Sequence, residues 1–153
     1  MTVYSSAGAS IKISAGAPAT YDATGYNALT FTTVGEVVDL GEFGREYNLI
    51  THNPIATRGT QKLKGSFNEG AVTLQLGLDT DDAGQILLKT AANSDNNYSF
   101  LVTTQNGDKY YFQAKVMSFK VGVGSVDSVT SATVSLELTT NAAGVGVVEA
   151  LSA

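Results

Sequence analysis

Residues 71–78 alternate strictly between apolar side chains and small or polar ones. Every second residue from Val72 to Leu78 is Val or Leu, which places the apolar side chains on one face of an extended chain. Residues 129–139 repeat the pattern, with Ala, Val and Leu on one face and Ser, Thr and Glu on the other. Both segments are therefore predicted to be strands that pack one face on a core.

Further segments carry strand signals. A short strand is predicted around 11–13, and a second over 31–40, where the apolar residues are too dense for clean alternation. The segments 98–104 and 109–120 flank Asn106-Gly107. This dipeptide favours a tight type I′ turn, so the two segments are predicted to form a β-hairpin.

One helix is predicted, over about 81–92. Either Asp79 or Thr80 can cap its first turn, and Lys89 lies near its C-terminal end, where a positive charge is favourable. Residues 22–27 are rich in turn-forming types and are predicted to be a turn.

Residues 41–65 form a long excursion between the strands, interrupted by glycines and by Asn53-Pro54. Excursions longer than about 12–15 residues are usually functional or disordered. Tyr47, Leu49 and Ile50 argue against disorder. The expected fold is therefore mainly β, with one helix and an extended loop or hairpin at 41–65.

The length of 153 residues suits one domain, residues 1–153, with arms at 1–9 and 140–153. The second arm is read either as a segment that orders against a neighbouring subunit or as a flexible terminus. Without cysteine there is no disulfide or thiol nucleophile, and a net charge of −5 disfavours tight nucleic-acid binding. No signal peptide or membrane anchor is expected, because no stretch approaches about 18 apolar residues.

No catalytic, cofactor-binding or metal site is expected. His52 is the single histidine, and no nucleophile motif accompanies it. The acidic run Asp79–Asp82 is explained by helix capping, with weak cation binding as the alternative. The closing Glu of an EF-hand is missing, because Thr90 occupies that position. Tyr110, Tyr111 and Phe112 are expected in the core.

The only local excess of positive charge consists of Arg58, Lys62 and Lys64. These side chains either protect a solvated strand edge from aggregation or form an interface with acidic groups of a neighbouring subunit. The residues alone leave both interpretations open.

Several motifs taken together resemble major tail tube proteins of long, flexible-tailed bacteriophages, over roughly residues 9–139. The motifs are Gly35-Glu36, Gly41-Glu42-Phe43-Gly44, Thr51-His52-Asn53-Pro54, Lys62-Leu63-Lys64-Gly65 and Gly124-Ser125-Val126-Asp127.

The resemblance implies a β-sandwich or partly closed barrel with one flanking helix. It also implies a structural virion protein that forms hexameric rings, which stack into the hollow tail tube that conducts phage DNA to the host. Its implied partners are further copies of itself, the tape-measure, tail terminator and tail-tip proteins, and DNA in transient, non-specific passage. The implied location is the phage tail, assembled in the host cytoplasm. A hexamer carries a charge of about −30, which disfavours adhesion of DNA.

Two sets of candidate residues follow. Lumen-facing candidates are the polar faces of the core strands and two nearby acids: Glu36, Asp39, Thr73, Gln75, Thr133, Ser135 and Glu137. Inter-subunit or inter-ring candidates lie on the long excursion: Glu42, Phe43, Arg45, Tyr47, His52, Arg58, Lys62 and Lys64.

Other functional classes stay open. A stand-alone β-sandwich binding or decoration module accounts equally well for the composition, and a single-ring tail terminator or connector shares the implied fold. A hydrolase is disfavoured, because no spacing suggests two carboxylates in a cleft.

Overall fold

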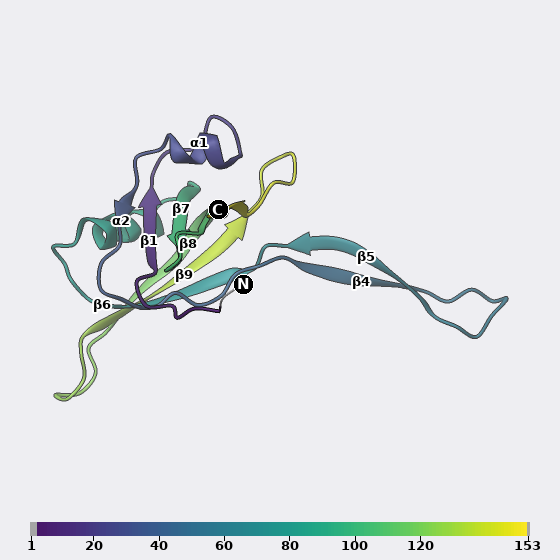
Figure 1. The fold of residues 1–153 in the computed structure, drawn as a ribbon. Helices are drawn as coiled ribbons and strands as arrows, with labels where there is room; N and C mark the ends of the chain where they lie inside the picture. Colours follow the sequence, from purple (N-terminus) through teal and green to yellow (C-terminus); the bar gives the residue numbers. More distant parts are fainter. Residues whose placement is uncertain (1–2, 153) are drawn as a thin grey trace.

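A curled antiparallel sheet and a two-stranded hairpin that projects from it make up the computed structural model, which describes residues 3–152 (Figure 1). The main sheet has the strand order β2-β1-β7-β8-β9-β6-β3. Strand β10 pairs with the first residues of β8, before the stretch of β8 that pairs with β9. Its strands are β1 (Ser10–Ser14), β2 (Thr32–Thr33), β3 (Val37–Asp39), β6 (Ala71–Gly77), β7 (Tyr98–Thr103), β8 (Lys109–Gly122), β9 (Ser131–Thr139) and β10 (Val148–Ala150). The hairpin consists of β4 (Glu46–His52) and β5 (Gln61–Asn68), and the helices are α1 (Ala23–Asn27) and α2 (Ala83–Ala92). The predicted mainly β class is confirmed.

The core lies on one face of the curled sheet. Val72, Leu74 and Leu76 of β6 are buried, as are the alternate residues of β9 from Ala132 to Leu138. Helix α2 covers this face with Leu88, which is completely buried. Each such side chain contributes about 1.5–3 kcal/mol through removal from water. Both alternation-based predictions are therefore confirmed.

Helix α2 is capped by Asp82, not by Asp79 or Thr80 as predicted. The Asp82 carboxylate accepts hydrogen bonds from the Gln85 and Gly35 backbone N–H groups, both at 3.0 Å. The second bond ties the helix start to the chain that leads into β3. The cap position is therefore decided by a partner 47 residues away in the sequence.

The Gln85 side chain joins three segments from a buried position, with 2% of its surface exposed. Its amide nitrogen donates to the carbonyls of Gly35 (3.0 Å) and Gly77 (2.9 Å), and its amide oxygen accepts from the Asp79 N–H (3.0 Å). Because buried polar groups are costly unless paired, this amide holds α2, the end of β6 and the loop before β3 together.

Residues 22–27, predicted as a turn, contain a second helix, α1, that covers the opposite face of the sheet at β7 and β8. Asp22 caps it, and its carboxylate accepts from the Gly25 N–H at 2.8 Å. Tyr26 stacks on Tyr111 of β8 with ring centroids 5.3 Å apart, and burial raises the pKa of both phenols. Tyr111 and Phe112 are both buried, on opposite faces, as predicted, whereas Tyr110 is only half-buried against the core.

The β7–β8 hairpin is present, but its turn is not type I′. The Gly107 N–H donates to the Thr104 carbonyl at 3.0 Å, and Gly107 has φ 93°. Glu36 is the only non-glycine among residues 3–152 with positive φ, so Asn106 cannot adopt the type I′ geometry. The connection is a type I turn followed by a left-handed glycine.

The segment 31–40 forms two short strands, β2 and β3, in place of one dense strand. Glu36, with φ 60°, lies between them, and its left-handed backbone interrupts the extended chain. At the other end of the chain, β10 pairs with Lys109 to Tyr111 of β8 in the same molecule. Part of the predicted C-terminal arm is thus docked on its own sheet.

Candidate assembly surfaces

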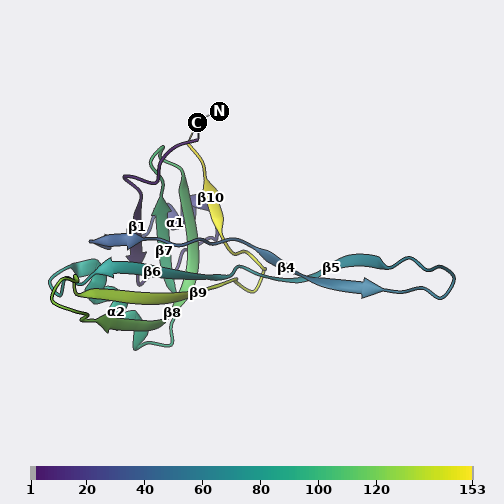
Figure 2. The same cartoon turned by 90° about the horizontal axis from the view of Figure 1, so that it is seen from below.

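The β4–β5 hairpin extends well beyond the main sheet (Figures 1 and 2). All seven residues of β4 are exposed, and so are the first four of β5. Large apolar side chains are among them: Leu49 is 65% exposed, Leu63 is 58% exposed, and Ile55 at the turn is fully exposed. Such a concentration of apolar surface is characteristic of a segment that is buried by a partner.

Cross-strand pairing gives the hairpin two distinct faces. Leu49 pairs with Lys64, and Ile50 pairs with Leu63 on the opposite face. Nearer the base of the hairpin, Asn48 lies opposite both Gly65 and Ser66 of β5. This two-against-one arrangement is a β-bulge. The long excursion is thus an ordered hairpin with apolar groups on both faces.

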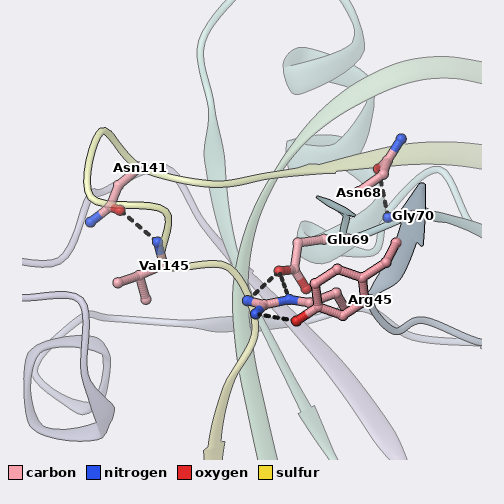
Figure 3. Close-up of polar contacts among 7 residues, drawn as sticks. Arg45, Asn68, Glu69, Gly70, Asn141 and Val145 are labelled. Carbon is pink, nitrogen blue, oxygen red and sulfur yellow. Dashed lines mark hydrogen bonds and ion pairs between the residues drawn. The ribbon is translucent and has the colours of Figure 1, made fainter. Parts of the chain in front are cut away.

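An ion pair lies at the base of the hairpin (Figure 3). The Arg45 guanidinium donates from Nε (3.0 Å) and Nη2 (2.8 Å) to Oε1 of Glu69, whose side chain is 3% exposed. The guanidinium also lies 3.7 Å from the centroid of the Phe67 ring. Hydrogen bonds to the Tyr47 hydroxyl and to Glu69 raise the pKa of Arg45, which keeps its charge. These contacts fix the direction in which the hairpin leaves the sheet.

The loop between β9 and β10 also packs against the Glu69 side chain, which Arg45 contacts. Asn141 shapes this loop, because its side-chain oxygen accepts from the Val145 N–H at 2.8 Å (Figure 3). At Gly146 any Cβ would collide with the Glu69 carboxylate. The C-terminal segment therefore takes part in positioning the hairpin.

The face of β6 and β9 that points away from the core is not covered by a helix of the described residues, and we call it the bare face. It carries five of the lumen-facing candidates. Thr73 pairs with Ser135 and Gln75 pairs with Thr133, while Glu137 lies one pair further along β9. All five side chains are exposed or half-buried. The structure thus brings them together on one surface.

The two acidic candidates lie at the edge of that surface. Asp39 of β3 pairs with Gln75. The Glu36 carbonyl accepts from the Gly77 N–H at 2.8 Å, which places Glu36 beside the end of β6. Both side chains are exposed.

Strand β8 adds two lysines to the same face, which the sequence analysis missed. Lys115 pairs with Glu137 and Lys120 pairs with Thr133. A bulge between Val116 and Ser118 shifts the alternation, so two lysines five positions apart share a face. The face therefore carries both signs of charge, whereas the expected candidates were only acidic or uncharged polar residues.

The inter-ring candidates fall into four groups. Tyr47, His52, Lys62 and Lys64 lie on the hairpin strands, Arg58 lies in the turn, and Glu42 is exposed before β4. Phe43 and Arg45 contact their own subunit. Phe43 packs against Tyr110 and Phe112 with centroids 5.5 and 5.6 Å apart.

Within residues 3–152, no group of three His, Cys, Asp or Glu side chains is placed to hold a metal ion. No helix in this part of the chain is both long and apolar enough to span a membrane.

No protein-family model matches the chain, and no curated protein matches it significantly. Among solved structures, a chain of the anti-feeding prophage baseplate, determined by cryo-EM with sixfold symmetry, superimposes with a TM-score of 0.65. The match has 11% identity and covers 91% of this chain and 93% of that one. A chain of the phage p2 baseplate, in its activated conformation with Sr, superimposes with a TM-score of 0.52 and 14% identity.

The p2 match covers 86% of this chain but only 44% of the p2 chain, so the protein corresponds to less than half of that neighbour. At these identities the likeness establishes a shared fold. The protein therefore has a fold that occurs in baseplate chains of phage-type assemblies.

Proposed function

We propose that this protein is a structural, non-catalytic subunit of a phage tail, which assembles as hexameric rings that stack into the hollow tube conducting DNA to the host. The observation that carries the proposal is the β4–β5 hairpin, with its exposed apolar side chains Leu49, Ile50, Ile55 and Leu63. A lone globular domain gains nothing from this surface, whereas contact with a second ring buries it.

The sheet supports the formation of a ring. Strand β7 pairs only with residues 109–114 of β8, so the edge of β8 that faces away from β9 has no strand partner from Lys115 to Gly122 within the described residues. An unpaired edge of this length is a hazard unless another strand covers it. A neighbouring subunit that pairs there would extend the β8-β9-β6-β3 face around a closed barrel. The sixfold symmetry of the anti-feeding prophage baseplate supports a hexamer.

In this arrangement the bare face lines the channel. Its hydroxyl and amide side chains, with Lys115 beside Glu137 and Lys120 beside Thr133, give a polar surface of mixed sign on a protein whose net charge is −5. Repulsion from the whole ring limits adhesion of DNA, and the few positive groups are too sparse to grip it. Tape-measure, terminator and tail-tip proteins are the expected partners.

Electron microscopy of the purified, concentrated protein at several salt concentrations tests the proposal. Hollow tubes with a regular axial repeat support it. A matched variant in which Asn-Gly replaces residues 49–64 keeps the Tyr47–Phe67 pair and closes a short hairpin. It should stay folded by circular dichroism and form no tubes. Tubes of normal length from this variant would refute the assignment of the hairpin.

A second candidate is a single-ring component, such as a terminator, connector or baseplate ring. It is favoured by one observation, that both structural neighbours described above come from baseplates. Isolated rings that never stack would support this role. Persistent monomers that bind a glycan on an array would favour a binding or decoration module instead.

A further inference from the structure

A groove of about 430 Å³ lies between α2 and the far end of β8. Its apolar lining consists of Leu78, Ile86, Phe119 and Val121. Two of these side chains are half exposed, Ile86 at 52% and Val121 at 51%. The groove is therefore an apolar surface that the subunit itself leaves uncovered.

The groove and the hairpin lie at opposite ends of the subunit. Strand β6 begins at Ala71, next to the hairpin base, and ends at Gly77, next to Leu78 in the groove. In Figure 2 β6 points one way and the hairpin extends the other way. A contact between these two ends joins copies head to tail. Repeated head-to-tail contacts build an open filament unless the rotation between copies closes them into a ring.

The two ends also have complementary charge. Residues 47–67 contain three basic residues, Arg58, Lys62 and Lys64, and no acidic one. Asp79 lines the groove and Asp81 follows two residues later, and both are exposed. Lys89 of α2 also lines the groove, so the two acidic groups outnumber the basic one. The only ion pair among residues 3–152 is Arg45–Glu69, so none of these charges forms an ion pair within the described residues, although the Lys64 ammonium lies 4.7 Å from the centroid of the Tyr47 ring.

We propose that the groove receives the hairpin of a second copy of this chain, with Ile55 as the apolar anchor and the hairpin's basic groups beside Asp79 and Asp81. This inference rests on the proposed stacking of rings and names its receiving surface. Apolar burial holds the contact, and the charges fix its orientation and speed association.

Cysteine pairs test the contact directly, because the chain contains no natural cysteine. Ile55→Cys and Ile86→Cys in one chain should give a ladder of covalent multimers on a non-reducing gel after mild oxidation. A matched control pairs Ile55→Cys with Thr133→Cys, on the bare sheet face, and should give no ladder. Ile55→Cys alone should give at most dimers.

Charge exchange gives an independent readout. Lys62→Glu should raise the protein concentration needed for assembly by about tenfold, since it places a negative charge beside two aspartates. Asp81→Lys in the same chain should restore most of the loss. Lys120→Glu makes the same change in net charge on the sheet face and should leave the hairpin contact intact.

The outcomes separate the two proposals. Wild-type tubes with no ladder from the Ile55–Ile86 pair, or with a ladder only from the control pair, overturn the groove and leave the tube intact. A wild-type protein that gives neither tubes nor ladders overturns both. A ladder from the Ile55–Ile86 pair together with rescue of Lys62→Glu by Asp81→Lys supports the groove.

Discussion

Replacing Gln85 with leucine should destabilise the subunit by about 3 kcal/mol. Leucine fills a similar volume but cannot pair with the Gly35 and Gly77 carbonyls or the Asp79 N–H, which lie 2.9–3.0 Å from the native amide. An unsatisfied buried group costs about 1–3 kcal/mol. Asp79 is exposed, so water can replace its partner, and the two carbonyls account for the main cost.

The predicted loss is large relative to a typical stability of 5–15 kcal/mol. In a chain of this length each kcal/mol lowers Tm by about 2–4 °C, which gives a decrease of about 6–12 °C. Urea denaturation of the monomer, followed by circular dichroism, measures the free energy of unfolding. The slope m should not change, because the surface exposed on unfolding is the same.

Gln75→Leu is the matched control, because Gln75 is exposed on the sheet face and makes no side-chain hydrogen bond within the described residues. It should change the free energy of unfolding by less than about 0.5 kcal/mol. If Gln85→Leu were as stable as this control, the structural role assigned to the buried amide would be wrong.

Leu74→Ala should cost about 2.7–5 kcal/mol in urea denaturation, because Leu74 is completely buried, whereas Leu49→Ala on the hairpin should leave the monomer unchanged and weaken assembly. Asp82→Ala removes the N-cap of α2 and should cost about 1 kcal/mol by the same measurement; no loss would show that another residue caps the helix equally well. Hydrogen bonds from the Ser152 backbone N–H and hydroxyl, chiefly the first, lower the pKa of Asp108 below 3.8. Its contribution to stability is therefore present above pH 3.8 and lost as the pH falls through the lower folded value, so Asp108→Asn should flatten the decrease of Tm in that acidic window.

Local periodicity predicted much of the fold. The alternation of residues 71–78 and 129–139 assigned buried and exposed positions correctly, because side chains on a strand change face at every residue. The helix over 81–92 was also found, since ten of its residues form α2. The excursion at 41–65 proved to be an ordered hairpin, as its apolar residues indicated.

Features that depend on distant partners could not be predicted. The cap at Asp82 and the pairing of Gln85 involve Gly35, which is about fifty residues away. Helix α1 has only five residues and is held in place by Tyr111, far along the chain. For the candidate surfaces, the polar face of β6 and β9 was foreseen. The lysines of β8 were not, because a bulge reverses the alternation between Lys115 and Lys120.

The pairing of β1 with β7 has a consequence for the order in which the chain acquires structure. Ser10 pairs with Thr103, so during synthesis β1 must wait for more than ninety residues to be added, which takes about 5–20 s at ribosomal rates. The β4–β5 hairpin needs only local contacts and can form in about 1–10 μs once it has emerged. The groove is completed later, because Phe119 and Val121 lie after β7. Each nascent subunit would therefore carry a finished hairpin before it has a groove of its own, so it can dock on a completed subunit before it can receive another copy.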